Sequence, residues 1–214
     1  MSGAGEQNGA AGRPFVVGLG GTPRPGSTSE RALEIAMAAA REAGARTAVL
    51  TAAELELPLY QPGLELDAPA AEFVTAIARA DGVLISTPGY HGGVSGLLKN
   101  ALDYTEELRE GPAPYLDGKA VGCIVCAHGW QAGTTTLVGL RSIVHALRGW
   151  PTPLGVAINS SPPEDGSDVL ESERVLSQLQ TVARQVVDFA QRPPRRDLPP
   201  EVAAGPGQPR KGEV

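Results

Sequence analysis

The sequence of 214 residues is poor in several residue types, and each shortage excludes a class of protein. Two cysteines are too few for the disulfide framework of a small secreted domain, and no Cys or His pair has the spacing of a zinc site. The net charge of −6 argues against a general nucleic-acid binder, which would carry a basic surface. No apolar run approaches a membrane span, and the first residues lack the apolar core of a secretory signal. The sequence therefore predicts a cytoplasmic protein without a metal, nucleic-acid or membrane partner.

The remaining composition predicts one globular domain between two polar ends. Hydrophobic residues make up 42% of the chain, which is long enough to bury a core. The residues 1–13 are rich in glycine and alanine, and the residues 192–214 are rich in proline and glycine. Both segments are predicted to be disordered, because they have little apolar content with which to offset ordering. The folded domain is thus expected over residues 14–191.

Within that domain, short apolar runs alternate with amphipathic segments. Strands are predicted at 14–20, 45–51, 82–87, 119–127 and 152–158, and helices at 28–43, 67–80, 95–104, 133–147 and 168–190. Strands that are apolar throughout should be buried on both faces, as in a parallel sheet covered by helices. The fold class is therefore α/β, with ligands bound beyond the carboxyl ends of the strands.

The loop after the first strand, GLGGTPRPGSTSE, combines small hydroxyl side chains with one arginine. It leads to a helix N-terminus, where unpaired N–H groups and the helix dipole attract anions. Pro23 stands where a dinucleotide fingerprint needs its third glycine, and Gly26 is not followed by the lysine of a P-loop. A terminal phosphate monoester, as on FMN, suits this loop, but a simple helix cap by Ser27 or Thr28 with a turn is the alternative interpretation.

The loop after the third strand, STPGYHGGVSGLLKNALDY, exposes backbone through four glycines around Tyr90 and His91. An aromatic side chain among glycines can lie against a flat ring whose edge bonds to bare backbone amides. A loop with one anchored tyrosine is the alternative. Ser95 is expected to cap the following helix.

Together, these two loops make the chain resemble the NAD(P)H-dependent FMN reductase family. The motifs are T-x-R-x-G-S after the first strand and P-x-Y-x-G-x-x-S-G-x-L-K-N-x-L-D after the third. The resemblance implies a flavodoxin-like three-layer sandwich with a five-stranded parallel sheet of order 2-1-3-4-5. It also implies an oxidoreductase that transfers hydride from NAD(P)H to FMN and on to an acceptor, with no catalytic side chain assigned.

The resemblance also assigns cofactor contacts by position. The FMN phosphate would be held by Thr22, Arg24, Ser27, Thr28 and Ser29, and the isoalloxazine would be lined by Pro88, Gly89, Tyr90, His91 and Gly92. Many relatives carry Glu at the position of Gly89 and Asn at the position of His91. His91 could donate to the flavin or to a substrate, or simply face solvent.

A third loop, CAHGWQAGTTT, corresponds to a glycine-rich loop that borders the flavin in this family. The resemblance places His128 and Gly129 near the pyrimidine side of the ring. Trp130 would cover the ring, form a pocket wall or make a subunit contact. Flavin sites in this family often lie between subunits, so a homodimer or homotetramer is implied.

Two further sequence features are interpreted as structural. Cys123 and Cys126 lie within a strand, where positions three apart point to opposite faces, so buried thiols are expected rather than a redox pair. Lys99 and Asn100 are interpreted as helix-start or interface residues, and His145 as a core or interface residue.

Three functions from different classes remain open at this point. The first is a flavin reductase, either of free FMN or of quinones, azo dyes or other xenobiotics through bound FMN. The second is an electron carrier of the flavodoxin type, which the mild acidity and the 4% aromatic content disfavour. The third is a scaffold without flavin. An absorbance spectrum and NAD(P)H oxidation with FMN distinguish them.

Overall fold

The computed structural model describes residues 12–63, 65–162 and 165–192. The predictions for residues 1–11 and 193–214 therefore lie outside the described residues.

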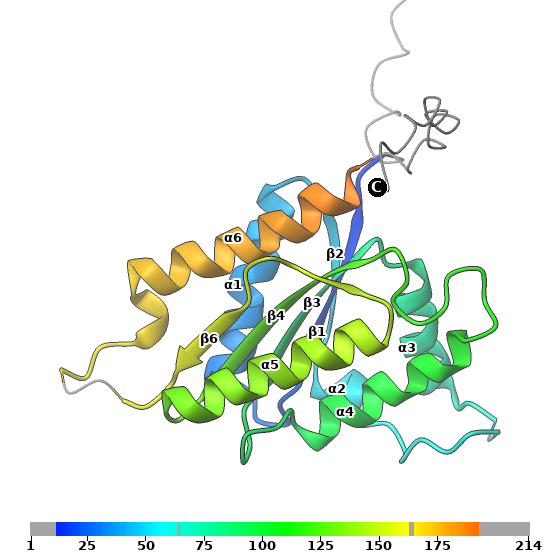
Figure 1. Ribbon diagram of the computed structural model, residues 1–214, viewed down its shortest axis with the longest axis horizontal. Helices are drawn as coiled ribbons and strands as arrows, with labels where there is room; N and C mark the ends of the chain where they lie inside the picture. The colour runs from blue at the N-terminus through cyan, green and yellow to red at the C-terminus, as the bar shows by residue number, and fades with distance from the viewer. Residues whose placement is uncertain (1–11, 64, 163–164, 193–214) are drawn as a thin grey trace, which may run out of the picture.

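A twisted sheet of parallel strands forms the middle layer (Figure 1). Its strands are β1 (Phe15–Gly20), β2 (Arg46–Leu50), β3 (Gly82–Pro88), β4 (Ala120–Ala127), β5 (Trp150–Pro151) and β6 (Val156–Asn159). The order is β2-β1-β3-β4-β5, and β6 also pairs with β4. Every pairing is parallel. The predicted flavodoxin-like order is confirmed, and all carboxyl ends meet at one rim of the sheet.

Helices cover both faces of the sheet (Figure 1). One face carries α1 (Thr28–Glu42) and α6 (Glu173–Ala190), and the other carries α3 (Ala68–Arg79), α4 (Gly96–Asp103) and α5 (Trp130–Ala146). The short elements α2 (Ala52–Leu55) and η1 (Tyr104–Leu108) were not predicted, and the helix predicted at 168–190 is divided into η2 (Val169–Glu171) and α6. No helix among the described residues is long and apolar enough to cross a membrane.

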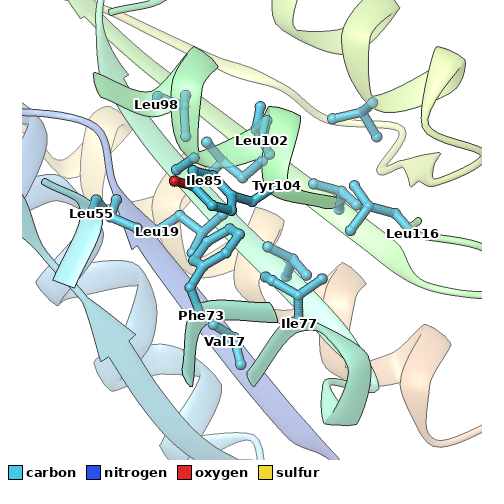
Figure 2. Close-up of a cluster of buried hydrophobic side chains, with 14 of the residues drawn as sticks. Val17, Leu19, Leu55, Phe73, Ile77, Ile85, Leu98, Leu102, Tyr104 and Leu116 are labelled. Atoms are coloured by element: carbon cyan, nitrogen blue, oxygen red, sulfur yellow. The ribbon is translucent and has the colours of Figure 1, made fainter. Parts of the chain in front are cut away.

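Two hydrophobic clusters, one on each face, hold these layers together. Alternate residues of β1 enter different clusters, Val17 on the α3–α4–α5 side and Val16 on the α1–α6 side. Figure 2 shows the first cluster, in which Phe73 and Ile77 from α3 meet Leu98 and Leu102 from α4 over the central strands. Burial on both faces explains why the strands are apolar throughout.

The last strand differs from its prediction, because the expected run 152–158 is interrupted. Pairing with β4 stops after Pro151 and resumes at Val156. Between them, side chains take the bonds of the ladder: Arg141 Nη1 donates to the Thr152 carbonyl at 2.7 Å, and the Leu154 N–H donates to Gln185 Oε1 at 3.0 Å. Pro153 also lacks the N–H that a continuous ladder would need. The result is two short strands in place of one.

Candidate functional site

A cavity of about 400 Å³ opens at the carboxyl rim of the sheet. It is bordered by the segments that follow β1, β3, β4 and β6, which is where ligands bind in parallel α/β folds. Its lining consists of Thr22, Arg24, Ser27, Thr28, Ser29, Pro88, Gly89, Tyr90, His91, Cys126, Ala127, His128, Ala132 and Ser160. The three loops that the sequence analysis selected thus meet around one cavity.

The segment after β1 presents hydroxyl groups at the start of α1. Ser27 caps the helix, since its Oγ accepts the Glu30 N–H at 3.3 Å and lies 3.2 Å from Ser29 Oγ. Thr22 Oγ1 accepts the backbone N–H of Arg24 at 3.2 Å. The helix cap is therefore confirmed, and it holds the hydroxyl groups at the positive end of the α1 dipole. The Arg24 side chain is exposed at the cavity, with no ion pair to another described residue.

The segment after β3 forms a tight turn at the cavity. Tyr90 and Gly93 exchange backbone hydrogen bonds of 3.0 and 2.9 Å, which leaves His91 and Gly92 at the tip. Both tip residues have positive φ, 52° for His91 and 80° for Gly92. Turns of this kind favour Asn-Gly, and histidine is among the few other residues that adopt this conformation. Ser95 caps α4 as predicted, because its Oγ accepts the Leu98 N–H at 3.1 Å.

Gly89 precedes that turn and lies directly on α5. A Cβ atom at this position would stand 2.9 Å from Thr136 Oγ1 and 3.0 Å from Ala127 Cβ. This close approach is the physical reason why the chain has glycine at position 89. Thr136 is fully buried there, and its hydroxyl has no hydrogen-bond partner within the described part of the chain.

The segment after β4 differs from its prediction, because α5 begins at Trp130 rather than at residue 133. Gly129, with a φ of 98°, precedes the helix, and its N–H donates to Asn159 Oδ1 at 2.9 Å. His128 and Ala132 line the cavity, whereas Gly92, Gly129 and Trp130 do not. The Trp130 side chain is 61% exposed on the surface.

Sequence reasoning missed four lining residues: Cys126, Ala127, Ala132 and Ser160. The first two are the carboxyl end of β4, a position that the fold itself indicates. Ser160 directly follows β6, and its N–H donates to the Ala127 carbonyl at 2.9 Å. A serine after the final strand was the available signal. No sequence signal marked Ala132, because small residues are common in loops.

The cavity has an anion-binding character. Its charged and titratable residues are Arg24, His91, His128, Tyr90 and Cys126, and none of the carboxylates in the described ranges lines it. Burial raises the pKa of the Cys126 thiol to about 12, so this thiol is neutral near pH 7. Hydroxyl groups and an arginine at one end, with bare backbone at Gly89, fit a flat ligand that carries one phosphate. No group of three metal-ligating side chains occurs among the described residues.

Of the residues interpreted as structural, Cys126 lines the cavity, whereas Cys123, Lys99, Asn100 and His145 do not. Cys123 and Cys126 are both buried and belong to different clusters, which confirms that they point to opposite faces. Lys99 Nζ contacts both Asp103 carboxylate oxygens, at 2.6 and 2.8 Å. Asn100 holds the chain near residue 58, since its Nδ2 donates to the Pro58 carbonyl at 2.9 Å. His145 is exposed on α5, so the core interpretation is wrong, and the interface interpretation stays a prediction.

Known proteins similar to this chain include a family and two curated relatives. A profile of the family described as NADPH-dependent FMN reductase matches residues 14–164. An FMN-dependent NADPH-azoreductase of Staphylococcus haemolyticus is 30% identical over 130 residues, which cover 59% of this chain and 65% of the relative. One of Staphylococcus aureus is 33% identical over 122 residues, covering 56% and 61%. The chain thus spans less than two thirds of the length of these relatives.

Solved structures share the fold at lower identity. FerB of Paracoccus denitrificans, a flavoenzyme NAD(P)H:(acceptor) oxidoreductase, has a TM-score of 0.68 at 20% identity, covering 83% of this chain and 97% of that one. The apo form of the NADH:FMN oxidoreductase EMOB has a TM-score of 0.64 at 23% identity, covering 83% and 88%. These likenesses establish the three-layer fold.

Proposed function

Because the chain belongs to the NADPH-dependent FMN reductase family, we propose that it is an NAD(P)H-dependent oxidoreductase that binds FMN in the cavity at the sheet rim. The observation that carries this proposal is the meeting of the hydroxyl-rich segment before α1 with the glycine-rich turn after β3 around one cavity, whose described lining contains no carboxylate. The first segment suits the phosphate of FMN, and the second leaves room for a flat ring.

Each cavity segment has a distinct role in the proposed complex. Arg24 and the hydroxyl groups of Thr22, Ser27, Thr28 and Ser29 hold the phosphate, supported by the N-terminal end of α1. Pro88, Gly89 and Tyr90 lie along the ring, with His91 and Gly92 at the tip of the turn. The same ring is bordered on the side of β4 and α5 by His128, Gly129 and Trp130. Of these three residues, His128 lines the cavity itself.

The side chains act by binding and orientation rather than by proton transfer. The flavin supplies the hydride chemistry when it is bound. No residue of the lining is needed as a general acid or base, and the raised pKa of Cys126 keeps that thiol out of nucleophilic chemistry near neutral pH. The exposed side chains of Tyr90 and His91 leave an open face, at which the nicotinamide and then the acceptor can dock in turn.

The acceptor separates two versions of this activity. One is release of reduced FMN as product, and the other is reduction of azo dyes, quinones or other xenobiotics by retained FMN. The names of the two curated relatives, both FMN-dependent NADPH-azoreductases, support the version with bound FMN and an azo acceptor. Gel filtration of the loaded protein, followed by assays with methyl red and with free FMN, distinguishes the two.

The same proposal extends to assembly, location and domain extent. A homodimer or homotetramer is proposed because Trp130 and Val138 expose apolar surface on α5, at 61% and 64%. A cytoplasmic location is proposed because the reaction needs NAD(P)H. One flavin domain over residues 14–191 is proposed because the sheet and helices extend over that range. Analytical ultracentrifugation and cell fractionation test the first two, and folding of the isolated 14–191 segment tests the third.

The direct test is FMN binding by the purified protein and by the variant Arg24→Ala. Loss of a charge-assisted contact should weaken FMN binding by about 1–3 kcal/mol in a fluorescence titration. Arg79→Ala, at an exposed arginine on α3 away from the cavity, is the control and should leave the affinity unchanged. The proposal is refuted if the wild-type protein takes up no FMN. It is also refuted if the protein oxidises neither NADH nor NADPH with any acceptor.

A further inference from the structure

Two of the three histidines of the chain line the cavity, and they come from different segments. His91 is at the tip of the turn after β3, and His128 directly follows β4. Both side chains are exposed at the cavity, and neither makes a hydrogen bond or ion pair with another described residue. The third histidine, His145, is exposed on α5 and does not line the cavity. The pair therefore has free donors that face the ligand space.

The turn itself does not require a histidine at position 91. Its φ of 52° is a conformation in which glycine or asparagine is preferred at such a turn. Backbone in sparsely populated regions clusters at functional sites, although Tyr115 and Arg148 also have positive φ here and do not line the cavity. The imidazole is also not packed in the core, because His91 is exposed. Burial and turn geometry therefore do not explain the histidine.

Charge distribution indicates what the pair would bind. The protein carries a net charge of −6, yet no carboxylate of the residues that the structure describes lines this cavity. The other titratable groups in the cavity lining are Arg24, Tyr90 and the thiol of Cys126, whose pKa burial raises to about 12. An imidazole donates one N–H when neutral and two when protonated, so it suits an anionic group in either form.

The histidines also lie apart from the proposed phosphate site. Arg24 and the hydroxyl groups follow β1, whereas His91 follows the next strand in the sheet, β3, and His128 the one beyond it, β4. Neighbouring strands are about 4.8 Å apart, so the β4 segment begins about 10 Å from the β1 segment. A phosphate held at the β1 segment does not extend as far as His128, which is left, together with His91 on the neighbouring β3 segment, for a second anionic group.

We propose that His91 and His128 together form a subsite for an anionic group on the second ligand. That group is a sulfonate, carboxylate or phosphate carried by a planar electron acceptor or by the nicotinamide nucleotide. The inference rests on the proposed function, because it takes the phosphate segment to be occupied by FMN. It makes the protein selective for charged over neutral acceptors of the same shape.

The experiment compares matched ligands on FMN-loaded protein without any reductant. The probes are 1,4-naphthoquinone-2-sulfonate against 2-methyl-1,4-naphthoquinone, and NADP⁺ against NAD⁺, with dissociation constants from quenching of tryptophan fluorescence. The variants are His91→Asn and His128→Gln, and the control is His145→Gln. Asparagine is the preferred residue for the turn, so His91→Asn should not unfold the protein. In separate turnover assays, KM ratios for the two quinones, and for NADPH against NADH, give a second readout.

In the wild type, the sulfonated quinone should bind more tightly than its neutral partner. Each cavity variant should lower that preference by about threefold to tenfold, as expected for a partly exposed charge-assisted contact. A fall in the sulfonate preference alone identifies the acceptor as the source of the anion, and a fall in the NADP⁺ preference identifies the nucleotide. The His145→Gln protein should keep both preferences.

Equal preferences in the wild type and both cavity variants overturn the histidine subsite and leave the reductase proposal intact. Loading with FMN is measured first, by absorbance. A chain that takes up no FMN overturns the proposed function, and the subsite falls with it.

Discussion

Thr136 carries the clearest residue-scale prediction, because its buried hydroxyl has no hydrogen-bond partner. Removing an unpaired buried polar atom while keeping the shape of the side chain also removes its desolvation cost. Thr136→Val should therefore raise the free energy of unfolding by about 1 kcal/mol in urea titrations. Thr135→Val, at an exposed position of the same helix, should change it little. A clear loss of stability in Thr136→Val would show that the hydroxyl is bonded after all.

At the same scale, the site could be predicted in part from the sequence. Ser27 and Ser95 were found because a hydroxyl side chain before a helix has a specific local function, and the structure confirms both caps. Asn159 was not found, although its Oδ1 accepts the Gly129 N–H at 2.9 Å. That contact joins residues 30 apart in the chain, and local patterns carry no information about such pairs.

The packing of α6 on the sheet gives a prediction at the scale of the element. Gly122 in β4 has no room for a side chain, since a Cβ atom there would stand 2.5 Å from Leu84 Cδ2 and 2.9 Å from Val182 Cγ2. Gly122→Ala should therefore lower the free energy of unfolding by about 1–3 kcal/mol, as overpacking does. Gly139→Ala in α5 meets nothing within 4 Å and should raise it by about 0.5–1 kcal/mol. Chemical denaturation measures both, and equal effects would contradict this account.

Elements were predicted well where periodicity decided them and less well where side chains intervened. The strands β1, β3 and β4 are apolar throughout, and their predicted ranges agree with the structure to within a residue at each end. The break between β5 and β6 depends on Arg141 and Gln185, which lie on α5 and α6. The early start of α5 depends on Gly129 and Asn159. Each of these is a contact between distant segments.

At the scale of the whole molecule, two buried thiols make stability fall in alkaline solution. Burial raises the pKa of Cys123 and Cys126 from 9.0 to about 12. The unfolded chain loses these protons near pH 9 while the folded chain keeps them. The contribution of the two protonated thiols to the free energy of unfolding is therefore complete below pH 9. The free energy of unfolding then falls as the pH rises towards 12, by at most about 1.4 kcal/mol per pH unit for each thiol.

Tyr60 acts in the same direction, since burial and a hydrogen bond to Glu107 raise its pKa from 10.0 to about 12. Urea unfolding at a series of pH values from 7 to about 11 measures the combined slope. The double variant Cys123→Ala and Cys126→Ala should be less stable at neutral pH but should show a shallower alkaline decline. An unchanged slope in that variant would mean that the thiols do not cause the decline.

The interruption between β5 and β6 affects how the protein behaves towards other copies of itself. A sheet edge with a long row of unpaired amides is a template on which neighbouring molecules add strands and form aggregates. Here that border offers strands of two and four residues, separated by a segment whose polar groups are already engaged. A strand from another molecule could pair with only a few consecutive residues along this side of the sheet. The interruption therefore disfavours the edge-to-edge pairing from which fibrils grow.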